Sequence, residues 1–129
     1  MIIVTLLHII YNEKLEFTQD GGGDISVSVK GHAVPEDSGG IGGSNTAKGE
    51  NIICAAVSFA ALTLLRSIKI VGNIDPDYTF DDGMLQFSVK VSELDSKKKQ
   101  VLKILIESFI IGILDLKQQY KDFITIQFN

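Results

Sequence analysis

The residues of this chain best suited to chemistry are one cysteine and one histidine. Cys54 is the only cysteine among 129 residues, and His32 is one of two histidines. A thiol and an imidazole can form a nucleophile–base pair, in which the histidine takes the thiol proton and later protonates the leaving amine. These two residue types could therefore form the nucleophile–base pair of a hydrolase, if the fold brings them together.

The residues around Cys54 predict a helix that would activate its thiol. Asn51 is a favourable N-cap, so we expect a helix over residues 52–67, with Cys54 in its first turn. Backbone N–H groups are free at a helix start, and they favour a thiolate and could hold an oxyanion. Ser58 follows Cys54 by one turn and would lie on the same side of the helix.

Each of these residues also has a purely structural interpretation. A free cysteine in an apolar helix often packs as a small buried hydrophobe. Ser58 could bond to its own helix backbone, and His32 could be a surface loop residue. His8 lies in an apolar strand-like run, where we expect a structural histidine. A metal site built from His8, His32, Cys54 and a carboxylate is poorly supported because these residues lack a tight ligand spacing, and we expect no cofactor.

A strand and a loop would position the histidine. Residues 24–30 alternate between apolar and polar side chains, which predicts a half-buried strand. Gly31 then allows a change of direction, so His32 would project at the strand's end. Residues 33–50 are rich in glycine and predict a flexible loop, which could order over a bound peptide. Its glycines do not match the patterns of phosphate-binding loops.

The order of predicted elements is β-β-α-β-β-α-β. It indicates one domain over residues 1–129, an α+β fold with two layers, in which both helices cover one face of a mixed sheet. A capping box at 92–95 would begin the second helix, which runs to about Tyr120. Gly112 within that helix indicates a close contact with a neighbouring element. The predicted elements are strands at 1–10, 24–30, 68–74, 84–91 and 122–128, and helices at 52–67 and 92–120, with a hairpin turn at 81–83.

Composition limits the classes of function. The net charge of −4 argues against a protein that binds nucleic-acid backbones directly. A single cysteine excludes an internal disulfide and fits a reducing cytosol. The apolar N-terminus lacks a positive leader region, and the apolar run 52–65 is too short to span a bilayer. We therefore expect a soluble, cytoplasmic protein that does not bind membranes.

Two motifs carry a resemblance to a known family. Gly31-His32-Ala33, followed by the segment 49–58 (Gly-Glu-Asn-Ile-Ile-Cys-Ala-Ala-Val-Ser), resembles the ribosomal-processing cysteine proteases called Prp. Residues 110–126 are similar to the final helix and strand of that family. The resemblance implies a cysteine endopeptidase with His32 and Cys54 as its catalytic dyad. It also implies substrate-binding or supporting roles for Gly31, Ala33, Asn51 and Ser58.

The same resemblance implies a substrate and a partner. Prp removes the N-terminal extension of a large-subunit ribosomal protein, the one numbered twenty-seven, after a short apolar-aromatic motif. By this resemblance the substrate is a disordered tail laid in extended form, with an aromatic pocket next to Cys54. The family also implies a homodimer.

The chain departs from the family pattern in two places. Asn51 stands where the motif usually has an acid, so it cannot supply negative charge. Cys54 follows His32 by 22 positions, a longer spacing than is usual in the family. The alternative is therefore a non-catalytic module of the same fold, associated with the ribosome or another protein. A thiol that reacts rapidly at neutral pH would favour the protease, and an inert one would favour the module.

Overall fold

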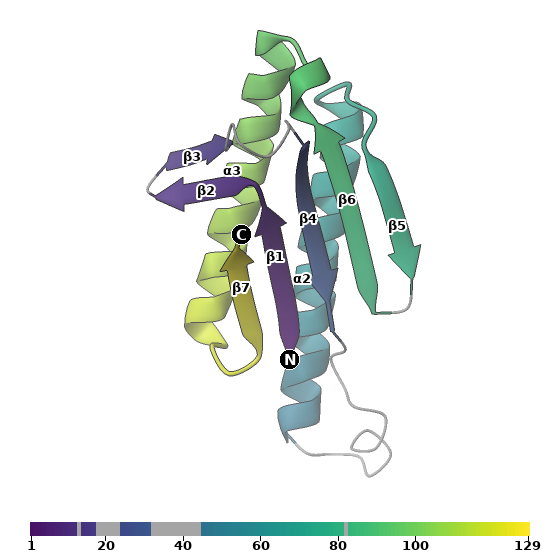
Figure 1. Cartoon of the computed structure of the whole chain (residues 1–129). Helices are drawn as coiled ribbons and strands as arrows, with labels where there is room; N and C mark the ends of the chain where they lie inside the picture. Colours follow the sequence, from purple (N-terminus) through teal and green to yellow (C-terminus); the bar gives the residue numbers. More distant parts are fainter. Residues whose placement is uncertain (13, 18–23, 32–44, 82) are drawn as a thin grey trace.

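The computed structural model describes residues 1–12, 14–17, 24–31, 45–81 and 83–129. These residues form seven strands, two long helices and one 3-10 turn (Figure 1). The strands are β1 (Ile2–Leu7), β2 (Ile9–Asn12), β3 (Lys14–Phe17), β4 (Asp24–Lys30), β5 (Asp77–Asp81), β6 (Met84–Lys90) and β7 (Ile124–Phe128). The helices are α2 (Asn45–Ile70), α3 (Ser96–Gln119) and the 3-10 turn η2 (Val91–Glu93).

Five strands form the main sheet, in the order β5-β6-β4-β1-β7. β1 pairs antiparallel with β4 and parallel with β7, so the sheet is mixed. Both helices lie on the same face of this sheet (Figure 1). The predicted two-layer α+β fold is therefore confirmed. The predicted strand over residues 1–10 is divided at His8, and its second part, β2, pairs with β3 in a separate two-stranded sheet.

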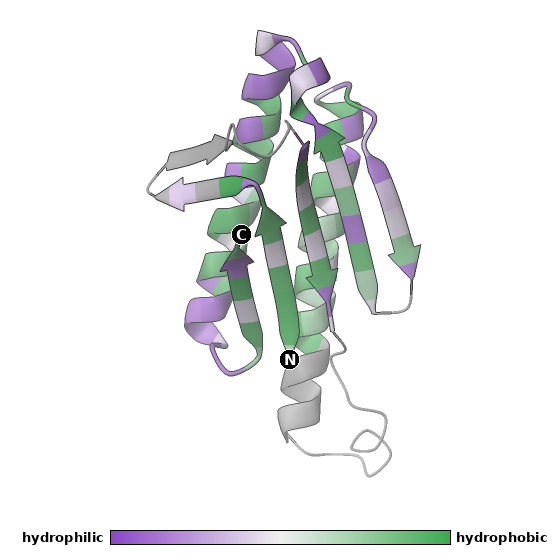
Figure 2. Cartoon of the chain, in the orientation of Figure 1, coloured by the Kyte–Doolittle hydropathy of each residue, from purple (hydrophilic) through white to green (hydrophobic). Residues whose placement is uncertain are grey.

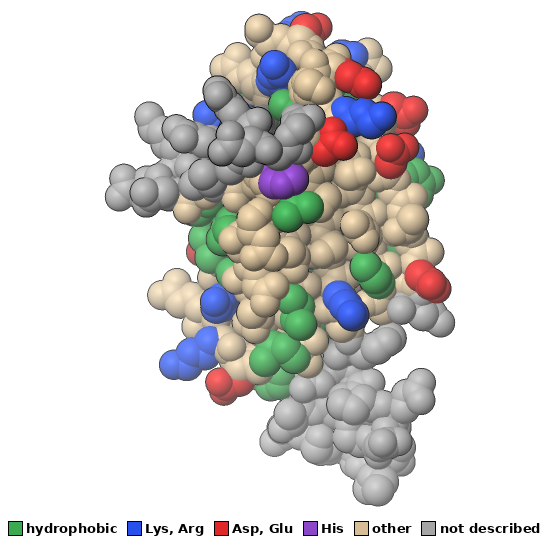
Figure 3. Space-filling model, in the orientation of Figure 1, with side chains coloured by type: hydrophobic (Ala, Val, Ile, Leu, Met, Phe, Trp, Pro, Cys, Tyr) green, Lys and Arg blue, Asp and Glu red, His purple; other side chains and the backbone are tan. Residues whose placement is uncertain are grey.

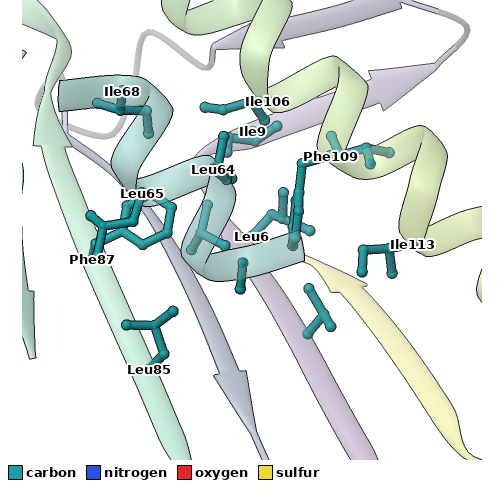
Figure 4. Packing of buried hydrophobic residues seen from close by; sticks show 14 of the residues in the cluster. Leu6, Ile9, Leu64, Leu65, Ile68, Leu85, Phe87, Ile106, Phe109 and Ile113 are labelled. Carbon is teal, nitrogen blue, oxygen red and sulfur yellow. The ribbon is translucent and has the colours of Figure 1, made fainter. Parts of the chain in front are cut away.

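The hydrophobic core lies between the sheet and the two helices. Apolar and polar residues alternate along β4 and β6 (Figure 2), and burial alternates along β1, because only one face of the sheet meets the helices. Figure 4 shows Leu64 and Leu65 of α2 pointing towards the sheet, where Leu6 and Phe87 meet them. α3 contributes a second apolar stripe: Leu102, Ile106, Phe109, Ile110 and Ile113.

The opposite face of the sheet is mostly tan in Figure 3, with charged and apolar side chains scattered over it. Pairing places one polar row across all five strands, and in it the Thr5 hydroxyl lies 3.4 Å from Oε1 of Gln127. This face is compatible with water. The row consists of Gln127, Thr5, Ser28, Gln86 and Thr79.

The first helix is longer than the sequence predicted. α2 begins at Asn45 and ends at Ile70, so Asn51 lies inside the helix and is not its N-cap. Residues 45–50 of the predicted 33–50 loop are therefore helical, and the rest of that loop lies outside the described residues. Ala47, Lys48 and Glu50 are good helix formers, which extends the helix through Gly49 despite a cost of about 1 kcal/mol.

The apolar stretch 68–74 is the end of α2 and not a strand. Ile68 is buried on the helix, and its carbonyl accepts a hydrogen bond of 3.1 Å from the amide of Ile74. Gly72 lies in this turn, where a side chain would clash with that same carbonyl. The two buried isoleucines thus belong to a helix and its C-terminal cap. A short apolar run is found both in buried strands and at buried helix ends, so the sequence pattern could not separate the two.

The second helix also begins later than expected. Ser92 lies in η2, and Asp95 is the N-cap of α3, with its side chain accepting from the Lys98 amide at 2.8 Å. The predicted capping box therefore does not form the start of the helix. The expected contact at Gly112 is absent as well, since a Cβ there would meet no atom of the described chain within 4 Å.

By length and composition alone, the segment 52–70 could cross a membrane. The sequence prediction had judged a shorter run, 52–65, and its argument from length no longer applies. In the fold, one side of this helix packs on the sheet, and 33% of the segment is buried. Core helices of soluble proteins meet the same criterion, so the finding assigns no membrane role.

Candidate active site

Cys54 lies at a pocket between α2 and one end of the main sheet. The cavity holds about 170 Å³, which is close to the size of apolar cavities that accept a benzene ring. Its lining is mostly apolar, so it suits one aromatic or large aliphatic side chain. α2 contributes Cys54, Val57, Ser58, Ala61 and Leu62, and the sheet contributes Ile2, Val29, Gly31, Phe80, Asp81, Gly83, Met84 and Leu85.

The helix presents its thiol and a hydroxyl to this pocket together. Cys54 is half-buried and Ser58, one turn further along, is exposed. Both line the same cavity, as their spacing on a helix predicts. Val57 and Ala61 are buried beside them and fix this part of α2 against the sheet. The cysteine is thus accessible from a cavity and is not a sealed core residue.

Gly31 forms the wall of the pocket opposite the helix. Its φ of +126° is a conformation that side chains rarely adopt, and a Cβ there would collide with the Met1 carbonyl oxygen. Its amide donates a hydrogen bond of 2.9 Å to the carbonyl of Gly83, in the turn between β5 and β6. Three chain segments therefore fix the end of β4 beside the cavity.

The other predicted site residues can be placed only in part. His32 and Ala33 lie outside the described residues, although the chain joins His32 directly to Gly31. Asn51 lies in α2, one turn before Cys54. The structure therefore brings together Cys54, Ser58 and Gly31 at one pocket.

The predicted activation by a helix start is not present. Cys54 lies about two and a half turns after Asn45, the first residue of α2. The free amides of a helix belong to its first turn, so the amide of Cys54 is not one of them. Neither a dipole-stabilised thiolate nor an oxyanion site at the Cys54 amide follows from this helix.

His8 lies at the other end of β1 from the pocket. Its Nδ1 is 2.7 Å from the Asp24 carbonyl oxygen, and its backbone has a φ of 60°. Six strand positions separate it from Ile2 at the pocket, which corresponds to ~20 Å. A metal ion cannot bind His8 and Cys54 together. Within the described part of the chain, no three His, Cys, Asp or Glu side chains form a possible metal site.

The sequence prediction missed the contribution of the β5–β6 hairpin. Phe80 and Met84 line the pocket although they follow Cys54 by more than 20 positions. Phe80 is 67% exposed, which is unusual for a phenylalanine in a strand. The predicted hairpin turn at 81–83 was the available signal, because it brings these two residues together.

Comparisons with known proteins concern the chain as a whole. The family model of the cysteine protease Prp matches residues 14–125. The SMU.848 protein of Streptococcus mutans has a similar structure, with 25% identity, coverage of 99% of this chain and 93% of that chain, and a TM-score of 0.66. No curated protein matches the chain.

Two further similar structures are of Prp from Staphylococcus aureus, described as an essential ribosomal processing protease. One is in complex with a substrate peptide, is 17% identical, covers 100% of both chains and has a TM-score of 0.67. The other, with a covalently linked product peptide, is 16% identical with a TM-score of 0.65 and the same coverage. At this identity the likeness shows the fold alone, and it is the family model, spanning most of the sequence, that shows that the chain belongs to the cysteine protease Prp family.

Proposed function

We propose that this chain is a cysteine endopeptidase in which Cys54 is the nucleophile and His32 is the base. The observation that carries the proposal is the position of Cys54 at an apolar pocket that Gly31 also lines. His32 is the next residue after Gly31 and belongs to the motif that resembles the Prp family. A thiol, a nearby imidazole and a pocket for one side chain are the parts that peptide cleavage needs.

The reaction would follow two steps. Cys54 Sγ attacks the carbonyl carbon of the scissile peptide bond while His32 takes the thiol proton. The C–N bond then breaks, His32 returns the proton to the leaving amine, and a thioester remains on Cys54. In the second step His32 deprotonates a water molecule that attacks the thioester, which releases the acid and restores the thiol. Gly31, Ala33, Asn51 and Ser58 would hold the peptide or the dyad in place.

The pocket supports selection of an apolar side chain beside the scissile bond. Its volume of about 170 Å³ accommodates one phenyl group. The relative from S. aureus is described as a ribosomal processing protease with a substrate peptide. As the resemblance to the Prp family implies, we propose as substrate the N-terminal extension of the large-subunit ribosomal protein numbered twenty-seven, cut in the cytoplasm during ribosome assembly.

We also propose a homodimer formed through the helix layer. A groove between α2 and α3 is lined by apolar side chains, among them Phe59 and Leu105. Phe59 is 74% exposed, and Ile104 and Ile111 of α3 are each about half exposed. Exposed apolar residues gathered beside one groove are typical of surfaces that bind another protein. Sedimentation of the purified chain over a concentration series would measure the dimer.

A cleavage assay tests the proposed activity. The purified chain is incubated with the cognate ribosomal protein, its extension intact, and the product masses are read. We expect one cut near the end of the extension, and loss of at least about a thousandfold in rate for Cys54→Ala and for His32→Ala. His8→Ala is the matched control, because it removes the other histidine from the opposite end of β1, and it should cleave like the parent chain.

The same assay separates the protease from a non-catalytic binding module. The absence of cleavage, together with slow alkylation of Cys54 by iodoacetamide, would contradict the proposal and favour the module. Cleavage that survives Cys54→Ala would also contradict it, because the nucleophile would then lie elsewhere.

A further inference from the structure

The edge of the main sheet at β5 leads directly to the Cys54 pocket. Among the described strands, only β6 pairs with β5, so its other side has no strand partner. All five of its residues are exposed. Sheet edges are usually blocked by proline, by lysine or by a bulge. The strand Asp-Tyr-Thr-Phe-Asp has no proline, no lysine and no irregular pairing, and its two charged residues, Asp77 and Asp81, lie at its ends.

The register of the hairpin determines which backbone groups point outward. Asp81 pairs with Met84 across a two-residue turn, and such a closing pair exchanges its hydrogen bonds. Antiparallel pairs alternate from there, so Thr79 and Asp77 also bond to β6. The backbone N–H and C=O groups of Tyr78 and Phe80 therefore point away from β6, towards the open edge. They form a template for one more strand.

The side chains of these same two residues lie on the helix side of the sheet. Tyr78 pairs with Phe87 and Phe80 pairs with Leu85, both buried in the core layer. Phe80 lines the Cys54 pocket, whereas Tyr78 lies further along the strand, with Lys69 Nζ 4.4 Å from its ring centre. On the helix side of the sheet, the side chains of a peptide on this edge would thus lie beside the rings of Tyr78 and Phe80. The thiol pocket would lie at one end of the peptide.

The other edge of the sheet is less open. Tyr11 of β2 stacks on Phe128 of β7, with ring centres 6.2 Å apart. The small two-stranded sheet therefore lies against the end of β7. Of the two edges, β5 is both the less covered and the one that borders the thiol.

We propose that the substrate binds as an added strand on the β5 edge, with its backbone paired to Tyr78 and Phe80. This inference rests on the proposed function, because it places the scissile bond of the same peptide at Cys54. The occupant is an extended segment of the substrate tail, with an apolar side chain at every second position facing Tyr78 and Phe80. Backbone pairing supplies affinity, and the pocket at the end of the strand selects one apolar side chain.

Proline scanning tests the backbone pairing. Proline is tolerated at edge positions whose N–H faces solvent, so Phe80→Pro and Tyr78→Pro should keep the β5–β6 ladder. Each is compared with the alanine variant at the same position, which also loses the ring but keeps the outward N–H. Binding is measured in the Cys54→Ala background by fluorescence anisotropy, with a labelled peptide spanning the cleavage site. We expect each proline variant to bind about tenfold more weakly than its alanine partner.

A second measurement needs no change in the protein beyond Cys54→Ala. Peptides that carry a single backbone N-methyl group at successive positions remove one N–H at a time. An added strand predicts that binding weakens at every second position across from β5, because only alternate amides face the edge. Equal binding by the proline and alanine variants, or N-methyl effects without alternation, would overturn the edge-strand proposal. So would a Cys54→Ala protein that binds no peptide.

These outcomes are separable from failure of the proposed function. If the parent chain cleaves the substrate but the N-methyl effects do not alternate, the protease proposal stands and the docking on β5 is wrong. If the N-methyl effects alternate but the parent chain does not cleave, the docking on β5 stands and the protease proposal is wrong.

Discussion

The two ends of β1 are held in different ways, and the proposed nucleophile borders only one of them. At the first end, Gly31 and Gly83 join the strand ends through a hydrogen bond of 2.9 Å and leave an apolar cavity that contains Cys54. At the other end, the His8 ring is hydrogen-bonded to the Asp24 carbonyl, and the His8 amide donates a hydrogen bond of 2.8 Å to the Asn129 carbonyl. Judged by residue type alone, the imidazole of His8 could be as reactive as the thiol of Cys54.

The difference shows that a reactive site requires space as well as a reactive group. His8 uses its Nδ1 to satisfy a backbone carbonyl, which gives the ring a structural role. Cys54 borders a cavity that Gly31 and Gly83 also line at the end of the sheet. Substitutions at the two ends of β1 should therefore have different consequences, one for the site and the other for stability.

The largest effect is expected for Gly31→Ala. A Cβ at this position would collide with the Met1 carbonyl oxygen, and the φ of +126° is strained for alanine. We expect a loss of about 3 kcal/mol in the free energy of unfolding, together with loss of cleavage, because His32 follows directly. Urea denaturation and the cleavage assay measure the two effects. A variant as stable and as active as the parent would show that this end of the sheet is not fixed in this way.

His8→Ala should have a smaller effect, and only on stability. It removes the hydrogen bond to Asp24 but keeps a positive φ, so we expect a loss of about 1.5 kcal/mol. His8→Gly loses the same bond yet relieves the backbone strain, and it should be about 1 kcal/mol more stable than the alanine variant. Both should cleave at the rate of the parent chain. A large loss of activity in either would contradict the contrast between the two ends.

Gly83→Ala tests the hairpin turn on the pocket side. Its φ of 73° is left-handed, so alanine should cost about 1 kcal/mol. Gly83→Asn is the matched control, because asparagine tolerates this conformation better. Thermal unfolding should rank the parent chain first, then asparagine, then alanine. Equal melting temperatures for the two variants would show that backbone strain does not limit this turn.

The sequence predicted the strands with one buried face better than the helix ends, one of which, 68–70, it assigned to a strand. Alternation along residues 24–30 and 84–91 identified two strands because each has one buried face, and the hairpin turn followed from Asp81 to Gly83. The start of α2 was wrong because Asn51 is a favourable cap in isolation, whereas the helix formers before it allow the helix to continue. A capping signal is local, and the actual boundary depends on the competing segment upstream.

The candidate site was predicted only where one element carries it. Cys54 was singled out as the only cysteine, Ser58 shares its side of the helix by spacing, and the resemblance to the family added Gly31; all three line one pocket. Phe80 and Met84 reach the pocket through strand pairing between distant segments, which a single sequence does not specify. Only the three-dimensional structure therefore shows that these two residues line the pocket.

The smallest effect on the free energy of unfolding is expected at Gly112, a glycine that no backbone conformation or close contact of the described chain requires. Gly112 lies inside α3, and a Cβ there would meet nothing within 4 Å in the described chain. Gly112→Ala should therefore raise the free energy of unfolding by about 0.5–1 kcal/mol, because alanine is the better helix former. Urea denaturation at a fixed, low protein concentration measures the gain in the monomer. Gly112 also borders the groove between the helices, where the dimer is proposed. A weaker dimer despite a more stable monomer would mean that a second copy approaches this glycine closely, as no part of the described chain does.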